Sequence, residues 1–250
     1  MINLKGKYIL VTGASSGIGS AVSQYAASHE ATLILSGRDT ERLEKTRLLL
    51  NGAGHLVFTG DITDFSVIDQ ITKTLIEKGI IISGFVHSAG IEKTLPFKSS
   101  KPEIFQEIFD INVFACFEFA RMLSMKNVVN PAGASFIFIS SVKGKLGAPF
   151  NVAYCASKSA LIAGSKAMAL ELASKKIRCN CVLPGIVETE LVQRLFDSIP
   201  SEAKEKIVHD HPLGLGKPED IAALTAFLLS DEAKWITGAE YIIDGGYSIH

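Results

Sequence analysis

A tyrosine and a lysine stand four residues apart in the segment 154–158 (YCASK), which has helical character. Side chains at this spacing share one face of a helix, so Tyr154 and Lys158 should lie close together. We expect the nearby ammonium to favour the phenolate and to lower the pKa of Tyr154 from its ordinary value of about 10. Such a phenol can work as a general acid or base. The pattern also occurs by chance on helix surfaces, so it requires support from other residues.

A serine supplies the first support. Ser141 follows the apolar run 135–139, which predicts a buried strand. The ends of strands are where a doubly wound sheet presents ligand-contacting residues. Two hydroxyl donors and a nearby cation can stabilise negative charge that develops on one oxygen of a substrate. Ser141, Tyr154 and Lys158 are therefore candidate catalytic residues.

A glycine-rich loop supplies the second support. The predicted strand near 7–11 runs directly into the sequence TGASSGIG at 12–19, and a helix follows. Gly13 permits a sharp exit from the strand, Gly17 lets backbone approach a ligand, and Gly19 allows close helix–strand contact. The helix N-terminus then offers unpaired N–H groups to a pyrophosphate. The spacing differs from the commoner G-x-G-x-x-G, and a glycine-rich turn without a ligand is the alternative.

The end of the second predicted strand indicates which dinucleotide binds. A carboxylate there would hold the ribose 2′-hydroxyl of NAD(H), but the sequence has Gly37 where the acid is expected and Arg38 beside it. A guanidinium suits a 2′-phosphate through charge-assisted and often bidentate contacts. We therefore expect NADP(H) rather than NAD(H). Arg38 could instead be a solvated surface charge, and Asp39 could cap the following helix.

The hydrophobic pattern predicts the elements that position these residues. Short β-branched runs alternate with longer stretches of helical period, which indicates βαβ units. The right-handed crossover rule then favours a doubly wound, Rossmann-type α/β fold, with a seven-stranded parallel sheet and helices on both faces. The predicted strands are Tyr8–Val11, Ala31–Leu35, Leu56–Phe58, Ile80–Val86, Ser135–Ile139, Ile177–Val182 and Glu240–Ile243. The predicted helices lie near 17–29, 40–51, 64–78, 103–128, 152–174 and 218–229.

Nothing in the sequence divides the chain into parts, so we expect a single domain over 1–250. One strand-to-helix connection, from Pro184 to about Pro218, is conspicuously long. Connections of more than about 15 residues in a compact domain are usually lids or binding loops. We expect a substrate lid at about 186–212, or a helical flap packed on the sheet. Its apolar residues at near-helical spacing are Leu191, Leu195, Phe196 and Ile207.

Composition argues against several classes of protein. Of the 250 residues, 47% are hydrophobic and 20% are charged, which is too apolar for a disordered chain. The formal net charge of −1 provides no basic field for nucleic acid. The four cysteines form no zinc or disulfide pattern, so we expect no metal and a reducing compartment. We see no signal-peptide core and no apolar run near ~18 residues, so we expect a cytoplasmic protein without a membrane partner.

These motifs together resemble those of the short-chain dehydrogenase/reductase family, in the branch typified by 3-oxoacyl-(acyl-carrier-protein) reductases. The resemblance covers essentially the whole chain and includes Ser141, Tyr154 and Lys158. Further matches are the glycine motif at 12–19, the adenine-ring aspartate Asp61, the structural and catalytic asparagine Asn112, the nicotinamide segment at Pro184, Gly185 and Thr189, and the C-terminal turn at 244–246.

The resemblance implies a mechanism in which a hydride passes between a nicotinamide and a substrate carbon. Tyr154 would protonate the carbonyl oxygen or deprotonate the alcohol, Lys158 would bind the nicotinamide ribose and tune Tyr154, and Ser141 would hold the substrate oxygen. Asn112 would maintain a backbone kink and a water that connects Lys158 to solvent. The implied cofactor-binding residues are Gly13, Ser15, Ser16, Gly17, Ile18, Gly19, Arg38, Asp61, Ile62, Ala89, Gly90, Tyr154, Lys158, Pro184, Gly185 and Thr189.

The sequence departs from the family after the fourth predicted strand. Where the family has Asn-Asn-Ala-Gly, this chain has His87-Ser88-Ala89-Gly90. Ala89 and Gly90 keep the backbone approach to the adenosine half of the cofactor. Loss of both asparagine side chains changes how the strand is braced. We interpret His87 as a hydrogen-bonded packing residue without a catalytic role.

Two substrate classes fit the sequence. The first is a 3-oxoacyl thioester on an acidic carrier that Lys175 and Lys176 could contact, although the stretch 130–133 (NPAG) has no basic residue where one would be expected. The second is a sugar, polyol or other small polar carbonyl compound, because the loop 91–94 (IEKT) beside the expected cleft is polar. The apolar residues of the expected lid favour the acyl chain, so we place the thioester first.

Other protein classes fit less well. A catalytically silent nucleotide sensor would not need the active-site residues, a methyltransferase would not need Tyr154 with Lys158, and a nucleotide-sugar epimerase usually has a longer C-terminal domain. The resemblance implies a homotetramer or homodimer, with interfaces at helices near 103–128 and 152–174 and at the last strand. Residues around more than one face of the first of these helices indicate burial on several sides, in an oligomer or in the subunit core. They are Phe114, Phe117 and Phe119.

Overall fold

The computed structural model describes residues 2–249, apart from the side chain of Ser198, so residues 1 and 250 of the expected domain lie outside the described part. Seven parallel strands form one sheet in the order β3-β2-β1-β4-β5-β6-β7. Because the order reverses between β1 and β4, this is the predicted doubly wound, Rossmann-type fold. The strands are β1 (Tyr8–Thr12), β2 (Thr32–Gly37), β3 (Leu56–Thr59), β4 (Ile82–His87), β5 (Ala134–Ile139), β6 (Ile177–Pro184) and β7 (Glu240–Ile243).

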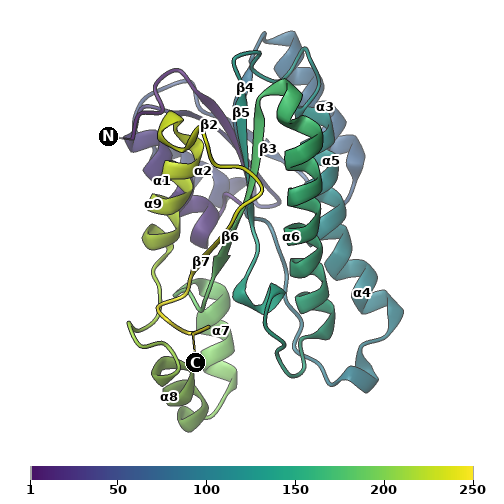
Figure 1. Cartoon of the computed structure of the whole chain (residues 1–250), viewed down its shortest axis with the longest axis vertical. Helices are drawn as coiled ribbons and strands as arrows, with labels where there is room; N and C mark the ends of the chain where they lie inside the picture. Colours follow the sequence, from purple (N-terminus) through teal and green to yellow (C-terminus); the bar gives the residue numbers. More distant parts are fainter. Residues whose placement is uncertain (1, 250) are drawn as a thin grey trace.

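Helices cover both faces of the sheet (Figure 1). The helices α1, α2 and α9 pack on one face, and α3, α5 and α6 pack on the other, with α4 beside α6. Their bounds are α1 (Gly17–Ser28), α2 (Thr40–Leu48), α3 (Phe65–Glu77), α4 (Pro102–Phe109), α5 (Ala115–Leu123), α6 (Val152–Leu172), α7 (Glu190–Ser198), α8 (Ser201–His209) and α9 (Pro218–Leu229).

The central strand explains why both faces need cover. In β1, Ile9 and Val11 are fully buried on the side of α1 and α9, and Leu10 is fully buried on the side of α3 and α5. Successive side chains of a strand point to opposite faces, so a continuous apolar strand is stable only between two layers of helices. The carboxyl end of β1 is thereby fixed where the glycine-rich loop begins.

An aromatic cluster joins β4, which pairs with β1, to β5. The Phe85 ring of β4 lies 5.7 Å from the Phe136 ring of β5 at an interplanar angle of 89°, and 5.6 Å from the Phe119 ring of α5. Edge-to-face contacts of this kind add roughly 0.5–1.5 kcal/mol each to the burial of the rings. The cluster fixes the relative positions of β4 and β5, whose carboxyl ends lead into Gly90 and Ser141.

The predicted element positions are confirmed except for one helix. Most ends shift by one or two residues, and β7 and α9 coincide with their predicted ranges. The helix predicted at 103–128 is wrong, because it consists of α4, a π-helical turn at Asp110–Phe114 and α5. A π turn is typical of functional sites. This one contains Asn112, whose side chain hydrogen-bonds both backbone groups of Ile91.

The three phenylalanines of this region have different surroundings. Phe119 is fully buried in the core. The Phe117 ring fills the space over Gly164 of α6, where an added Cβ would lie 2.4 Å from the ring. Phe114 is 44% exposed. Packing inside the subunit therefore accounts for Phe117 and Phe119, and Phe114 is the one of the three that faces solvent.

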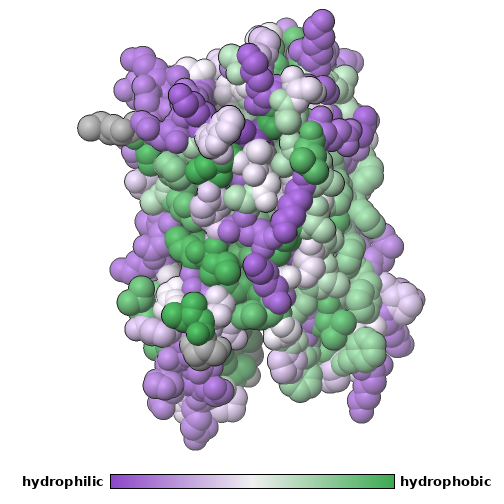
Figure 2. Space-filling view, in the orientation of Figure 1, coloured by the Kyte–Doolittle hydropathy of each residue, from purple (hydrophilic) through white to green (hydrophobic). Residues whose placement is uncertain are grey.

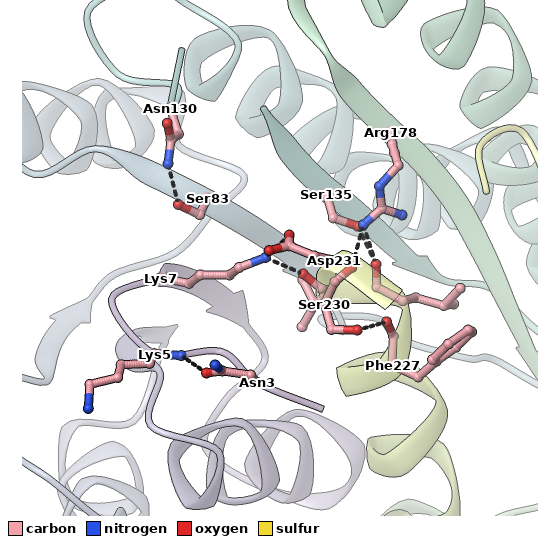
Figure 3. Close-up of polar contacts among 12 residues, drawn as sticks. Asn3, Lys5, Lys7, Ser83, Asn130, Ser135, Arg178, Phe227, Ser230 and Asp231 are labelled. Carbon is pink, nitrogen blue, oxygen red and sulfur yellow. Dashed lines mark hydrogen bonds and ion pairs between the residues drawn. The ribbon is translucent and has the colours of Figure 1, made fainter. Parts of the chain in front are cut away.

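Polar contacts fasten the amino ends of the strands to α9 (Figure 3). Arg178 at the start of β6 donates to the carbonyl oxygen of Leu228 at 2.7 Å, and Ser135 of β5 donates to the same oxygen at 2.8 Å. Lys7, just before β1, pairs with Asp231 at 2.6 Å. Cationic donors at a helix C-terminus satisfy its unpaired carbonyl groups and oppose its negative dipole end. The amino ends of these strands are thus tied to the end of α9. The cleft lies at the opposite edge of the sheet, where the strands have their carboxyl ends.

The long connection after β6 contains two short helices, α7 and α8, which project past the carboxyl end of the sheet (Figure 1). Thr189 caps α7, because its Oγ1 accepts a hydrogen bond from the backbone N–H of Val192 at 3.4 Å. The longest helix, α6, has 21 residues and includes Lys158 and Lys166. Across residues 2–249, none of the helices has both the length and the apolar character needed to cross a membrane.

Candidate active site

A cleft of about 560 Å³ opens along the carboxyl edge of the sheet. Its volume falls within the range of about 300–1,000 Å³ that is usual for small-molecule sites. Six lining residues end or directly follow the first six strands: Gly13, Gly37, Gly60, Ser88, Ser140 and Gly185. The cleft therefore lies at the topological switch point, where doubly wound sheets bind their ligands.

The glycine-rich loop forms the floor of the cleft. Gly13 has φ +66°, and a Cβ added there would lie 2.7 Å from the backbone nitrogen of Ala89. A Cβ added at Gly19 would lie 2.3 Å from the carbonyl oxygen of Gly13. Both positions thus require glycine, Gly13 for the turn and the approach of β1 to β4, and Gly19 for helix packing. Gly19 does not line the cleft, so its part is structural.

The N-terminus of α1 is open to the cleft. Ser16 occupies the N-cap position, but its side chain makes no cap hydrogen bond. Ser15, Ser16, Gly17 and Ile18 all line the cleft. The first N–H groups of a helix lack partners inside the helix, and they carry its partial positive charge. An uncapped helix start beneath a glycine cradle fits the pyrophosphate of a dinucleotide.

Arg38 and Asp61 lie at the far end of the cleft. Arg38 is exposed and lines the cleft, and Asp39 caps α2 by accepting from the backbone N–H of Arg42 at 3.0 Å. Asp61 accepts from both the backbone N–H and the hydroxyl of Thr63, at 3.0 and 2.9 Å. These bonds, with the charge of Arg38, lower the pKa of Asp61. The residues present fit the adenosine end of a dinucleotide.

Tyr154, Ser141 and Lys158 meet at the other end, as the sequence predicted. The phenol of Tyr154 hydrogen-bonds with Ser141, which follows β5. Lys158 is buried, donates to the carbonyl oxygen of Ile139 at 2.8 Å, and places its ammonium 5.6 Å from the centre of the Tyr154 ring. Ser140 braces the arrangement, because its hydroxyl donates to the carbonyl oxygen of Lys158 at 2.9 Å.

The predicted pKa of Tyr154 is wrong in direction. Burial, followed by the negative charge of Glu92, raises the pKa of Tyr154 above its ordinary value, and the hydrogen bond with Ser141 opposes this rise. Burial also lowers the pKa of Lys158, to about 8. The charged forms of both groups are disfavoured because the protein replaces the water around them. At neutral pH the phenol therefore holds its proton.

Glu92 and Lys143 form an ion pair in the wall beside Tyr154. The Lys143 ammonium lies 2.7 Å from a Glu92 carboxylate oxygen, and both side chains are about one-fifth exposed. The same ammonium is 5.6 Å from the centre of the Tyr154 ring. The backbone N–H of Lys143 donates to the Ser141 hydroxyl at 3.2 Å. A carboxylate and an ammonium thus face the space where a substrate would meet Ser141 and Tyr154.

Asn112 supports the site from behind. Its side chain accepts from the backbone N–H of Ile91 at 2.9 Å, and donates to the Ile91 carbonyl oxygen and the Ser157 hydroxyl, each at 3.0 Å. Asn112 is fully buried and does not line the cleft. Asn112 thus fixes the loop after β4 against α6. The backbone kink that the family resemblance implied at Asn112 corresponds to the π turn.

His87 is a packing residue, as predicted. The hydroxyl of Thr12 accepts from the backbone N–H of Ala89 at 3.3 Å and forms a second hydrogen bond, 3.0 Å long, with Nδ1 of His87. Burial, with the charge of Lys158, lowers the pKa of His87 to about 3. The ring therefore stays neutral and braces β4 against β1, in place of the asparagine of the family pattern.

The segment after β6 forms the last wall of the cleft. Pro184, Gly185 and Thr189 line it. A Cβ added at Gly185 would lie 2.9 Å from Cα of Asp244, so the C-terminal turn packs directly behind this wall. The ring of His211 accepts from the backbone N–H of Ile186 at 3.2 Å and joins the connection to the same wall.

The structure brings nearly all of the predicted site residues into one cleft. The exceptions are Gly19 and Asn112, which support it from outside. The predicted residues that line it are Gly13, Ser15, Ser16, Gly17, Ile18, Arg38, Asp61, Ile62, Ala89, Gly90, Ser141, Tyr154, Lys158, Pro184, Gly185 and Thr189.

Sequence reasoning missed two ion pairs of the cleft. One joins Lys143 to Glu92, and the other joins Arg42 of α2 to Glu190 of α7. Lys143 stands two residues after Ser141, which was a usable signal for the first pair. The second pair joins residues 148 positions apart, and the sequence gave no indication that they meet.

Comparisons with known proteins agree with this geometry. Residues 13–248 match a family model described as enoyl-(acyl carrier protein) reductase. The chain is 33% identical over 251 residues to 3-oxoacyl-(acyl-carrier-protein) reductase FabG from Thermotoga maritima, covering 99% of this chain and 100% of that protein. It is also 33% identical over 253 residues to the NADP-dependent (R)-specific alcohol dehydrogenase of Lentilactobacillus kefiri, covering 98% of each.

A solved structure matches the fold over almost the whole chain. The structure of a short-chain type dehydrogenase/reductase from Mycobacterium ulcerans superposes with a TM-score of 0.90 at 27% identity, covering 99% of this chain and 92% of that one.

Proposed function

The chain belongs to the short-chain dehydrogenase/reductase family, and we propose that it is an NADP(H)-dependent oxidoreductase that interconverts a carbonyl group and a secondary alcohol. The observation that carries the proposal is the meeting of Ser141, Tyr154 and Lys158 at one end of a cleft that fits a dinucleotide. A protein that only binds a nucleotide does not need a partly buried phenol and a buried amine at that point.

The chain's residues supply the proton and the positioning. A bound reduced nicotinamide supplies the hydride. Ser141 and Tyr154 would both donate hydrogen bonds to the carbonyl oxygen, and Tyr154 would release its proton to that oxygen as charge develops. The Lys158 ammonium, 5.6 Å from the ring, would stabilise the resulting phenolate. Oxidation of the alcohol is the reverse, with Tyr154 taking up the proton.

The protonation states favour reduction at neutral pH. The raised pKa of Tyr154 keeps the phenol protonated, which is the form that a general acid needs. Oxidation needs the phenolate, so it should gain as the pH rises.

The preference for NADP(H) is supported by Arg38. It lines the cleft where the 2′-substituent of the ribose would lie, and no carboxylate replaces Gly37 there. The carboxylate of the neighbouring Asp39 caps α2, so it is hydrogen-bonded to the helix backbone rather than to a ribose. The printed name of the Lentilactobacillus relative as NADP-dependent agrees with this assignment.

A 3-oxoacyl thioester is the first substrate class. The name of the Thermotoga relative supports it. The start of α7 also contributes apolar side chains, Leu191 and Val192, to the cleft wall beside the nicotinamide segment. We propose that the connection at about 186–212 acts as the lid over an acyl chain.

A small polar carbonyl compound is the second class, and one observation favours it. Glu92 and Lys143 place a carboxylate and an ammonium beside Tyr154. An acyl chain would gain nothing from this pair, whereas the hydroxyl groups of a polyol or sugar could accept from Lys143 and donate to Glu92. Both classes use the same chemistry at Tyr154.

Oxidation of NADPH in the presence of candidate carbonyl compounds tests the proposal. Acetoacetyl-coenzyme A represents the thioester class, and dihydroxyacetone represents the polar class. We expect turnover with the thioester, and the Lys143→Met enzyme should retain it. Turnover with dihydroxyacetone that Lys143→Met suppresses would instead assign the polar class. Lack of turnover with a broad panel of carbonyl compounds and either cofactor would contradict the enzyme proposal and favour a nucleotide sensor.

The proposed assembly is a homotetramer or homodimer, and the proposed location is the cytoplasm. β7 lies at the edge of the sheet, and Ile242 on it and Ile249 beyond it are exposed. Apolar side chains lie among polar ones on the face that carries β7 and the C-terminal segment (Figure 2). An exposed edge strand with apolar residues is a common pairing surface. Light scattering tests the assembly.

The state of the cysteines supports the proposed location. All four are free thiols, as the reducing cytoplasm would keep them.

A further inference from the structure

An ion pair crosses the mouth of the cleft at its adenosine end. The guanidinium of Arg42, in the first turn of α2, hydrogen-bonds the carboxylate of Glu190, the first residue of α7. Both residues line the cleft, together with Arg38 and Asp39. The pair therefore joins the wall that should hold the ribose 2′-substituent to the start of the proposed lid.

Arg42 lies on the same wall as Arg38. The backbone N–H of Arg42 donates to the Asp39 carboxylate at 3.0 Å, which folds the first turn of α2 back onto the loop that contains Arg38. Asp39 is thereby engaged with the helix backbone. The guanidinium of Arg42 is about one-third exposed, so a ligand in the cleft can reach it.

Glu190 has a second cation within reach. Arg194, one helical turn along α7, lies 3.6 Å from the other carboxylate oxygen of Glu190 and is 74% exposed. If Arg42 turned to a different anion, Glu190 would keep a cationic neighbour and a solvated position. Exchange of the Arg42 partner would therefore leave no buried, unpaired charge, which is the usual obstacle to breaking an ion pair.

We propose that Arg42 is a second guanidinium for the 2′-phosphate of NADP(H), and that Glu190 is a built-in competitor that holds Arg42 until this phosphate arrives. The inference rests on the proposed NADP(H) specificity and extends it. A ribose phosphate carries roughly −1.5 to −2 charges at pH 7, and two guanidinium groups match that charge better than one. NAD(H) has no such group, so it leaves the Arg42–Glu190 pair in place.

Glu190 should therefore lower the affinity for NADPH without affecting the affinity for NADH. A partner that must be displaced reduces the apparent affinity by the fraction of protein in which Arg42 is available. Exposed ion pairs are weak, so the reduction should be about two- to fivefold. An increase in NADPH affinity on removal of Glu190 is diagnostic, because loss of a residue that merely supports the cleft would weaken the binding of both cofactors.

Cofactor binding to single variants tests the proposal without turnover. Glu190→Gln keeps the shape of the side chain and removes its charge, so NADPH should bind about two- to fivefold more tightly, with NADH unchanged. Arg42→Gln should weaken the binding of NADPH by about tenfold or more and the binding of NADH by less than about twofold. Glu188→Gln is the matched control: it removes the same charge from an exposed position two residues earlier, outside the adenosine end of the cleft. It should leave both affinities within about twofold.

The minimal ligands adenosine 2′,5′-bisphosphate and adenosine 5′-monophosphate separate the possible failures. Should the wild-type protein bind both equally, the assignment of NADP(H) itself is wrong. Should it prefer the bisphosphate while Arg42→Gln preserves that preference, NADP(H) stands and the role of Arg42 is wrong. Should Glu190→Gln bind NADPH no more tightly than Glu188→Gln does, Glu190 is not a competitor.

Discussion

The ammonium of Lys158 lies 5.6 Å from the centre of the Tyr154 ring and donates a hydrogen bond to the carbonyl oxygen of Ile139. The phenol hydrogen-bonds with Ser141. Burial shifts the two pKa values in opposite directions, raising that of Tyr154 and lowering that of Lys158 to about 8. At neutral pH the site thus contains a protonated phenol beside an amine that is still mostly protonated.

Removal of the phenol hydroxyl should abolish turnover and leave the cofactor site intact. In Tyr154→Phe, we expect the rate of carbonyl reduction to fall by about 10²–10⁴-fold, because the variant lacks the hydroxyl group that would deliver the proton. NADPH affinity, measured by fluorescence, should change by less than about threefold, since the ring itself remains in the cleft wall. Comparable turnover in this variant would remove Tyr154 from the mechanism.

The charge of Glu92 should be visible in the pH dependence of the reaction. Because that charge raises the pKa of Tyr154, Glu92→Gln should lower this pKa and leave the Lys143 ammonium beside the phenol. Alcohol oxidation needs the phenolate, so its rise with pH should begin at a lower pH in the variant. Glu107→Gln is the control, since Glu107 pairs with Lys93 at an exposed position outside the cleft. An unshifted profile in Glu92→Gln would contradict the coupling.

The buried Lys158 should make the folded state less stable at neutral pH than a neutral side chain would. Its pKa falls from 10.5 to about 8 on folding, so the unfolded chain holds more protons between these values. The contribution of Lys158 is therefore most unfavourable below pH ~8, and stability should rise with pH until about 10.5. Lys158→Met should raise the free energy of unfolding at pH 7 by on the order of 1–3 kcal/mol, and the gain should shrink as the pH rises. Urea unfolding at several pH values measures this difference, and a pH-independent loss would refute it.

Arg38 should discriminate between the two dinucleotides. Loss of a charge-assisted contact to phosphate costs about 1.5–3 kcal/mol, so Arg38→Ala should weaken NADPH by roughly 10- to 100-fold. NADH should lose less than about threefold. Arg47→Ala controls for helix stability, because Arg47 lies on α2 but pairs with Glu44 and does not line the cleft. Equal losses of NADPH and NADH would undo the phosphate assignment.

The two glycines Gly19 and Gly147 should respond differently to alanine. A Cβ at Gly19 would lie 2.3 Å from the backbone oxygen of Gly13, whereas a Cβ at Gly147 would meet nothing within 4 Å. Gly19→Ala should cost more than about 3 kcal/mol of stability, because two backbone segments must separate. Gly147→Ala should stay within about 0.5 kcal/mol of the wild type. Thermal unfolding of the pair tests whether the close packing under the phosphate loop is real.

The sequence could predict the sheet because its signals are local. Runs such as 9–11 are apolar at every position, which only a strand covered on both faces tolerates. The meeting of Ser141, Tyr154 and Lys158 was also predictable, since Tyr154 and Lys158 share a helix face and Ser141 closely follows a strand. Local pattern did not predict the π turn, because the turn depends on a contact between Asn112 and the distant backbone of Ile91, and only the family resemblance implied a backbone kink there.

The electrostatics of the site could not be read from spacing. Proximity of Lys158 suggested a lowered pKa for Tyr154, but the direction depends on burial and on Glu92, which approaches from another loop. The Arg42–Glu190 pair has the same character, since it forms only when α2 and α7 reach the same edge of the sheet. Local pattern predicts which residues face a site, and the fold decides which charges they meet there.

The contact between Gly185 and Asp244 has a practical consequence for handling this protein. A Cβ at Gly185 would lie 2.9 Å from Cα of Asp244, whose carboxylate in turn accepts from the backbone N–H groups of Gly246 and Ser248. Residues 244–248 therefore support the nicotinamide end of the cleft. An affinity tag fused there, or a short truncation, amounts to an active-site alteration, and purification handles belong at the other terminus.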